Sequence, residues 1–228
     1  MGNRIVVINP NSSTGVTRDI DRALDGFRDG AGDEIDCLTL AEGPPGIETQ
    51  RHVDGVVAPL CRLIESQDNR ASAFVIACFS DPGLHAVRET TAKPVFGIAE
   101  SGLLTALTLG DQIGVIAILP GSIPRHARFM RALGIESRVA GELAVGLGVT
   151  ELSEEAVTLD RMTEVGQQLR VEKGADVLVL GCAGMARYRA RLEDALDLPV
   201  VDPTQAAVGM AITATRLGYR TGARPAAL

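Results

Sequence analysis

An internal repeat constrains the fold of this chain more than any other feature of its sequence. Three strand-and-loop segments of the first half recur in the second half, in the same order and displaced by 104 to 108 residues. The paired segments are residues 5–12 with 113–122, 74–78 with 178–182, and 94–96 with 199–201. Similarity between any two strand-and-turn units is common, but three ordered pairs at nearly one offset predict two halves of similar architecture.

Short, β-branched apolar runs alternate with amphipathic segments in both halves. This alternation is typical of a parallel α/β sheet covered by helices on both faces. The runs expected to form strands are 4–8, 34–40, 73–77, 95–98, 113–118, 137–140, 177–180 and 200–201, and the helical segments include 15–27, 53–66, 125–133 and 154–173. We predict an α/β protein of two similar domains with parallel sheets, related by a pseudo-twofold duplication. The first domain would comprise residues 1–98 and 205–228, and the second residues 99–204.

The composition argues against several classes of partner. The net charge is −7 and the basic residues form no cluster, so we expect no nucleic acid and no anionic membrane surface. Aromatic residues make up 3% of the chain, without Trp, which disfavours stacking platforms for bases or sugars. The first apolar stretch, residues 5–8, is too short for a signal peptide or a transmembrane helix. We therefore expect a cytoplasmic protein that acts on a small-molecule substrate and keeps its thiols reduced.

The four cysteines, at positions 37, 61, 78 and 182, include no C-x-x-C pair. This spacing disfavours a structural zinc site or a thioredoxin-like motif, and we expect no metal. Cys37 falls inside a predicted strand and Cys61 inside a predicted helix. Both are expected to be packing residues.

Cys78 and Cys182 each end an apolar strand and precede a helical segment. In parallel α/β sheets this is the edge where ligands bind. After Cys78, Asp81 suits a helix N-cap and Pro82 suits the first helical position. We expect the N-terminus of that helix to lower the pKa of Cys78 and to attract anions. After Cys182, small residues would let a ligand approach the backbone ahead of a helix over residues 186–196.

A single cysteine at the end of a strand is more often a core residue than a catalyst. The repeat changes this weighing, because the two cysteines stand at equivalent places in the two halves. If the halves face each other, the thiols approach one cleft from opposite sides. That arrangement suits a reaction that removes a proton from one face of a carbon and returns a proton to the other face.

Four segments carry a resemblance to a known family. Residues 9–12, 77–84, 97–100 and 180–185 resemble the hydantoin and allantoin racemase branch of the aspartate/glutamate racemase superfamily. The resemblance implies two α/β domains with the active site between them, no cofactor, and one catalytic cysteine from each domain, here Cys78 and Cys182. Asn9 stands where glutamate racemase-like members carry Asp, and residues 182–184 replace a Cys-Thr-His-like run. Both departures disfavour a free amino acid as substrate.

The resemblance also suggests residues that bind the substrate. The backbone N–H groups of Phe79 and Ser80, with the Ser80 hydroxyl, would hold a substrate oxygen, and those of Ala183 and Gly184 would do so on the other side. Such donors stabilise the charge that grows on a carbonyl oxygen when the neighbouring carbon loses its proton. The other predicted substrate-binding residues follow strands in the sequence: Asn9, Asn11, Ser12 and Ser122. For the last three, turn formation is an equally good explanation.

The remaining titratable residues give weaker signals. Glu100 is an acid just beyond a strand, and capping of the following helix explains it equally well. His52, His85 and His126 have no partner at an informative spacing. We therefore expect neither histidine catalysis nor a metal site.

The predicted function is a cofactor-independent racemase in which one thiolate removes a proton next to a carbonyl and the other thiol returns one. Two enzymes of the same fold are alternatives: maleate cis–trans isomerase, which has both cysteines, and arylmalonate decarboxylase, whose single cysteine lies in the second half. A third alternative is a non-catalytic protein that binds a small ligand and would not need both thiols. We expect a homo-oligomer.

Overall fold

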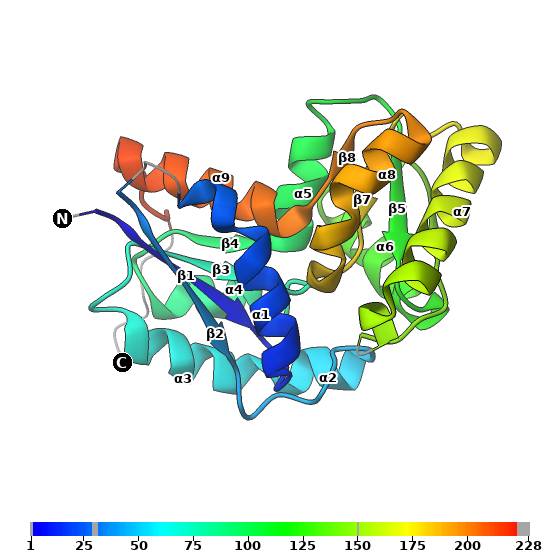
Figure 1. Ribbon diagram of the computed structural model, residues 1–228. Coiled ribbons are helices and arrows are strands. Elements are labelled where there is room, and N and C mark those ends of the chain that lie inside the picture. Colours follow the sequence, from blue (N-terminus) through cyan, green and yellow to red (C-terminus); the bar gives the residue numbers. More distant parts are fainter. Residues whose placement is uncertain (1, 29–31, 150, 223–228) are drawn as a thin grey trace.

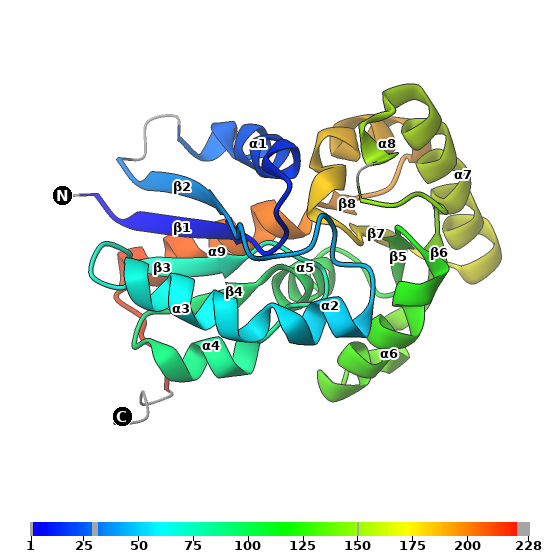
Figure 2. The ribbon, with the colours of Figure 1, turned by 90° about the horizontal axis from the view of Figure 1, so that it is seen from below.

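The structure is a computed structural model that describes residues 2–28, 32–149 and 151–222. It contains two four-stranded parallel sheets (Figures 1 and 2). The first sheet has the order β2-β1-β3-β4 and the second the order β6-β5-β7-β8. The strands are β1 (Arg4–Asn9), β2 (Glu34–Thr39), β3 (Ala73–Ile76), β4 (Val95–Gly97), β5 (Ile113–Ala117), β6 (Val139–Ala144), β7 (Val177–Leu180) and β8 (Val200–Val201).

The two sheets repeat each other strand for strand, as the sequence predicts. In the first sheet Ile5 of β1 pairs with Ala73 of β3, and in the second Ile113 of β5 pairs with Val177 of β7. The first strand of each half in the sequence, β1 or β5, lies inside its sheet. It is next to β3 or β7, the strand that precedes Cys78 or Cys182. The predicted α/β class with two similar parallel sheets is confirmed.

Helices cover the faces of both sheets (Figure 2). They are α1 (Thr14–Ala23), α2 (Gln50–Gly55), α3 (Val57–Gln67), α4 (Leu84–Thr90), α5 (Ile98–Ala106), α6 (Ile123–Ala132), α7 (Glu155–Lys173), α8 (Arg189–Leu196) and α9 (Pro203–Leu217). Short 3-10 helices are η1 (Asp25–Phe27), η2 (Pro120–Ser122), η3 (Glu136–Arg138), η4 (Glu151–Ser153) and η5 (Ala183–Tyr188). None of the helices in the described ranges combines the length and the apolar character needed to cross a bilayer.

The helix that follows the last strand of each sheet packs against the other sheet. Helix α5 leaves β4 and contacts β7 and β8, whereas α9 leaves β8 and contacts β3 and β4 (Figure 1). The two helices also contact each other, and Gly102 allows this approach, since a Cβ there would lie 2.8 Å from the Cβ of Pro203. The predicted domain boundaries, residues 1–98 with 205–228 and residues 99–204, stay a prediction. Residues 1, 29–31, 150 and 223–228 of those domains lie outside the described residues.

The two halves share one apolar core. A single cluster of buried side chains contains Ile5 and Val75 from the first sheet together with Leu178 and Leu180 from the second. Tyr188, in η5, is fully buried in this cluster and donates its hydroxyl hydrogen to the carbonyl of Leu152 at 2.6 Å. Because this core is continuous, the relative position of the two carboxyl edges is set by packing as well as by the chain connections.

Strand β6 differs from its predicted range of 137–140. It begins at Val139 and continues through Glu142 to Ala144. A carboxylate in a strand interior argues against a buried position unless it has a partner. Here Glu142 has one, because its Oε1 lies 2.5 Å from Nδ1 of His126 and the Glu142 side chain is 5% exposed.

Candidate active site

Cys78 and Cys182 occupy equivalent places at the carboxyl ends of β3 and β7. Each follows its strand by two residues, and each is half-buried. The backbone N–H of Ser80 hydrogen-bonds the sulfur of Cys78, and the backbone N–H of Gly184 does the same for Cys182. Negative charge on Cys182 also raises the pKa of Cys78, so the two sulfurs are close enough to interact across the halves. The structure therefore brings the two predicted catalytic thiols together.

The expected lowering of the Cys78 pKa is wrong. Burial raises the pKa of Cys78 to about 12 and that of Cys182 to about 11, because a thiolate loses solvation there. The backbone donors oppose this effect at both thiols, and Arg125 opposes it at Cys78. The helix after Cys78 gives little help, since α4 begins only at Leu84, after a left-handed turn at Gly83 (φ 66°). After Cys182 the 3-10 helix η5 begins at once, and α8 follows from Arg189 rather than from residue 186.

Asp81 caps a different helix from the one the sequence predicts. Its backbone is left-handed (φ 40°), and its two carboxylate oxygens accept hydrogen bonds from the backbone N–H groups of Ala99 and Glu100 at 2.9 and 2.8 Å. These groups open α5. Gly97 leaves room for the carboxylate, because a Cβ there would lie 2.2 Å from Cγ of Asp81. Asp81 thus ties the Cys78 loop to the helix that crosses to the second sheet.

Asp81→Ala is expected to lower the free energy of unfolding by about 2 kcal/mol or more, because it leaves two enclosed N–H groups unpaired. Asp176 is a matched control, since its carboxylate also accepts from two backbone N–H groups, of Asp111 and Gln112, but is exposed. Asp176→Ala should cost less, because water replaces the lost acceptor. Urea denaturation of both variants measures the difference, and an equal cost would contradict the role of Asp81.

The two carboxyls should also differ in the sign of their pH dependence. Burial raises the pKa of Asp81 to about 7, whereas backbone hydrogen bonds led by that of Gln112 lower the pKa of Asp176. The stability that Asp81 contributes is therefore present below its unfolded pKa and lost as the pH rises through 7. That of Asp176 is present above its unfolded pKa and lost as the pH falls. The costs of the two alanine variants should follow these opposite trends.

Asn9 and Asn11 mostly build the loop after β1. Asn9 is 1% exposed, and its Nδ2 donates to Oδ1 of Asn11 at 2.9 Å and to Oγ1 of Thr17 at 3.0 Å. Its Oδ1 accepts from the backbone N–H of Asn11 at 3.2 Å. Nδ2 of Asn11 takes no part in these bonds. The structure thus gives Asn9 a role in shaping the loop and leaves Asn11 with a donor for a ligand.

The other predicted binding residues differ in how far their polar groups are already engaged. Ser122 is 2% exposed and donates its hydroxyl hydrogen to the carbonyl of Leu119 at 2.7 Å, so it closes a turn. Ser12 is half-buried, and its backbone N–H donates to the carbonyl of Pro44 at 2.9 Å. Ala183 and Gly184 are buried, and a Cβ at Gly184 would lie 3.8 Å from the sulfur of Cys182. The tighter contact of such a Cβ would be with Cδ1 of Leu152, at 3.3 Å.

The surroundings of Ser80 contain residues that sequence reasoning missed. Oγ of Ser80 accepts from Nε of Arg125 at 3.0 Å and lies 3.5 Å from Nε2 of His126. His126 is 3% exposed, and the ring of Phe79 meets its ring edge-on at 5.2 Å between centroids. The partner of His126 is Glu142 of β6, 16 residues further along the chain, and a separation of this length suggests no contact in the sequence. The one local sign of a polar site was the neighbouring Arg125.

Two acids lie near Cys182. Asp202 and Glu48 both raise the pKa of this thiol. Asp202 is 2% exposed and caps α9 through Oδ1, which accepts from the backbone N–H of Gln205 at 2.7 Å, and burial raises its own pKa to about 6. Glu48 comes from the first half, and its Oε1 accepts from the backbone N–H of Val149 at 3.2 Å. Among the charged side chains near the thiols, Asp81 raises the pKa of Cys78 and Arg125 lowers it, whereas the carboxyls of Asp202 and Glu48 both raise that of Cys182.

Glu100 forms an ion pair rather than a cap. It lies in α5, and its Oε2 accepts from Nη2 of Arg88 at 2.5 Å, while Arg88 also donates to the carbonyl of Val95. His85 is exposed on α4, and Nδ1 of His52 accepts from the backbone N–H of Glu48 at 3.3 Å. Within the described residues, no group of three or more His, Cys, Asp or Glu side chains could hold a metal ion.

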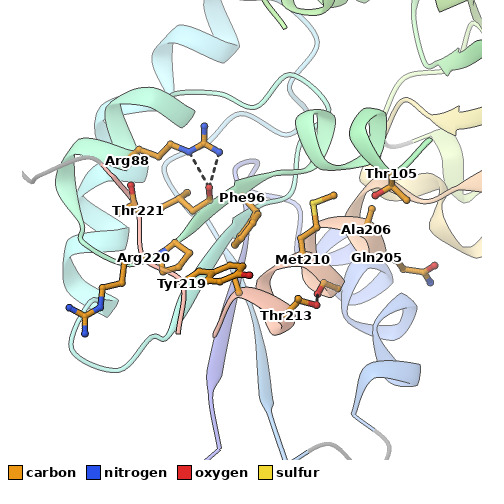
Figure 3. Close-up of a pocket in the computed structure, with 14 residues that line it drawn as sticks. Arg88, Phe96, Thr105, Gln205, Ala206, Met210, Thr213, Tyr219, Arg220 and Thr221 are labelled. Atoms are coloured by element: carbon orange, nitrogen blue, oxygen red, sulfur yellow. Dashed lines mark hydrogen bonds between the residues drawn. The ribbon is translucent and has the colours of Figure 1, made fainter. Parts of the chain in front are cut away.

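Two cavities differ in how near they lie to the thiols, since the smaller one reaches Gly184 beside Cys182. One of about 180 Å³ lies between the halves, lined by Ser13 and Val16 on one side and by Leu152 and Gly184 on the other. A larger one of about 660 Å³ lies between β4 and α9, where Phe96, Met210 and Tyr219 line it (Figure 3). The larger cavity contains none of the predicted site residues.

Known proteins resemble this chain over nearly its whole length. The family model of Asp/Glu/Hydantoin racemase matches residues 5–211. A hydantoin racemase of Paenarthrobacter aurescens is 35% identical over 96% of this chain and 93% of its own. The structure of an allantoin racemase from Klebsiella pneumoniae superposes with a TM-score of 0.92 at 30% identity, covering 97% of this chain and 91% of that one.

A glutamate racemase from Francisella tularensis shares the fold at 21% identity, with a TM-score of 0.68 over 98% of this chain and 86% of its own. The family match spans both sheets and both cysteine loops. The chain belongs to the Asp/Glu/Hydantoin racemase family and is an isomerase of the racemase class.

Proposed function

We propose that this chain racemises hydantoins, including allantoin-type ureides, by proton transfer between Cys78 and Cys182 without a cofactor. The observation that carries the proposal is the equivalence of the two thiols. Each stands two residues beyond a central strand, each receives the backbone N–H of the second residue after it, and the two interact electrostatically. The similarity to a hydantoin racemase and an allantoin racemase supports the substrate class.

The mechanism is a two-base exchange. One thiolate removes the proton from the ring carbon that lies between a carbonyl and a nitrogen, and becomes a thiol. The electron pair of the broken C–H bond moves onto the carbonyl oxygen, where fixed N–H donors stabilise the resulting enolate. The second thiol then gives its proton to the opposite face of the carbon and becomes the thiolate. For the other enantiomer the two cysteines exchange roles.

The raised pKa values of the thiols bear on how this cycle starts. With pKa values of about 12 and 11, both thiols are protonated at neutral pH in the free protein. One proton has to leave before the first abstraction. Arg125 favours a thiolate at Cys78 while Asp81 opposes it, and the carboxyls of Glu48 and Asp202 favour a protonated Cys182. Activity should follow a macroscopic pair of pKa values that belongs to both thiols.

The alternatives fit the residues less well. An arylmalonate decarboxylase needs one cysteine, in the second half, and would leave Cys78 and its hydrogen bond without a role. A non-catalytic binding protein would need neither thiol. Maleate cis–trans isomerase uses two cysteines and differs from the proposal in substrate. We further propose that the protein is a homo-oligomer and works in the cytoplasm, where its four free cysteines stay reduced.

The test is a substrate panel followed by polarimetry. Single enantiomers of 5-substituted hydantoins, allantoin and free amino acids are incubated with protein that has been dialysed against a chelator. We expect loss of optical rotation with hydantoins or allantoin above the rate without protein, and none with free amino acids. Activity that disappears on chelation and returns with a metal, or activity confined to amino acids, would contradict the proposal.

A further inference from the structure

The loop after Cys78 is held by a chain of polar groups that comes from the other half of the molecule. Ser80 belongs to the first half, whereas Arg125 and His126 lie on α6 and Glu142 lies on β6. The distances along the chain are 3.0 Å from Arg125 Nε to Ser80 Oγ, 3.5 Å from Ser80 Oγ to His126 Nε2, and 2.5 Å from His126 Nδ1 to Glu142 Oε1. The side chains of His126 and Glu142 are 4% and 5% exposed.

The chemistry of the two ends sets the direction of the hydrogen bonds of Arg125 and Glu142. An ionised Glu142 can only accept, so the Nδ1–H of His126 donates to it, and Arg125 can only donate, so Oγ of Ser80 accepts from it. In the neutral tautomer of His126 that carries its hydrogen on Nδ1, Nε2 accepts the hydrogen of the Ser80 hydroxyl. Every link has one donor and one acceptor.

This chain ends beside the thiol. Arg125 lowers the pKa of Cys78 through its charge, and the backbone N–H of Ser80 lowers it through a hydrogen bond. Phe79, between Cys78 and Ser80, packs edge-on against the ring of His126, with an angle of 78° between the rings. The Ser80 side chain, which binds Arg125, is therefore linked to His126 and, through it, to Glu142.

Among the residues that the structure describes, no such chain reaches Cys182. The residue equivalent to Ser80 in the repeat is Gly184, which has no side chain to bind. Gly184 belongs to the 3-10 helix η5, so the position of its backbone N–H is set within its own half. A disturbance of the chain from Glu142 should therefore reach Cys78 and leave Cys182 largely unaffected.

We propose that His126 and Glu142 are positioning residues for Cys78: they fix Ser80, and through it Arg125, beside this thiol and not beside Cys182. The inference rests on the proposed function, because it assigns the pair to one of the two acid/base thiols.

The order Ser80, His126, Glu142 is also that of a hydrolytic triad, in which the serine is the nucleophile. Here the Ser80 oxygen already accepts a hydrogen bond from Arg125, which draws electron density from it. We expect that Ser80→Ala leaves hydrolysis of p-nitrophenyl acetate unchanged. Ester hydrolysis that is lost with this substitution would identify Ser80 as a nucleophile and overturn the positioning role.

The decisive experiment measures each thiol separately. Cys182→Ser leaves Cys78 as the one base of the pair and Cys78→Ser leaves Cys182, so exchange of the substrate α-proton in heavy water reports each thiol. Adding Glu142→Ala to the first background should slow the exchange at least about tenfold, and adding it to the second should change the rate less than about twofold. Glu142→Gln keeps a carbonyl acceptor for His126 and should restore most of the lost rate.

Two controls separate positioning from loss of fold. Glu136→Ala removes the carboxylate of the exposed ion pair with Arg131 in the same half and should change neither rate. Ser80→Ala breaks the chain with little change in volume and should reproduce the selective loss even if Glu142→Ala fails to fold. Equal losses in both backgrounds, or no loss with Cys78 as base, would overturn the inference. If neither single-cysteine parent exchanges the α-proton of either enantiomer, the result contradicts the proposed function itself, and the inference that rests on it is overturned as well.

Discussion

Replacing either Cys78 or Cys182 by serine is expected to reduce racemisation by at least about a thousandfold. A positioned acid or base contributes about 10²–10⁴-fold to a proton transfer, and each substitution removes one of the two groups that every turnover needs. A serine hydroxyl is a far weaker acid than a thiol, so it can serve neither as the base nor as an efficient donor at neutral pH. Polarimetry with each pure enantiomer measures the loss, and circular dichroism checks that the fold is retained.

Cys37→Ser is the matched control, because it makes the same chemical change at a half-buried cysteine. Burial raises the pKa of Cys37 to about 12, as it does for Cys78, so a raised pKa does not by itself mark a catalytic thiol. Cys37 hydrogen-bonds with Asp21 and Arg28, away from the paired loops. Cys37→Ser and Cys61→Ala should keep most of the activity. Near-normal racemisation by Cys78→Ser or Cys182→Ser would refute the two-thiol mechanism.

The second large effect is a difference between the two enantiomers in the rate at which each single-cysteine variant exchanges their α-proton. Two enantiomers have equal free energies, so any variant changes kcat/KM for inversion by the same factor in both directions. Exchange of the α-proton with solvent has no such constraint. A base reaches only the proton that points at it, so each variant should exchange the α-proton of one enantiomer and leave that of the other in place.

The two variants should show opposite preferences. After the remaining thiol has removed the proton, it exchanges with solvent and returns deuterium to the same face, because the serine opposite is a poor donor. The α-proton signal then disappears from the proton NMR spectrum while optical rotation stays nearly constant. The rate without protein is subtracted, since hydantoins exchange slowly by themselves. Exchange of both enantiomers at equal rates by one variant would mean that a single base reaches both faces.

The sequence by itself determined the architecture and the place of the thiols. β-branched runs that alternate with amphipathic segments are typical of a parallel α/β sheet. For seven of the eight strands, both predicted ends lie within one residue of the observed ends. The repeat located Cys78 and Cys182 at equivalent carboxyl edges, because position relative to a strand is local information. The same local information gave turn formation as an alternative role for Asn11, Ser12 and Ser122, and left their part in binding open.

The tertiary structure decided everything that depends on groups distant in the sequence. Local rules make Asp81 the cap of the next helix, but its carboxylate reaches α5, because the chain turns left-handed there and α5 starts beside it. They also predict a lowered Cys78 pKa, whereas desolvation raises it, and desolvation depends on what the other half covers. The predicted strand of residues 137–140 stops before Glu142, and sequence spacing offers no partner for His126. Each is the other's partner, brought together by the packing of α6 on β6. Pairing of this kind is invisible in sequence spacing, since the free energy of a buried charge depends on the side chain that folding places beside it.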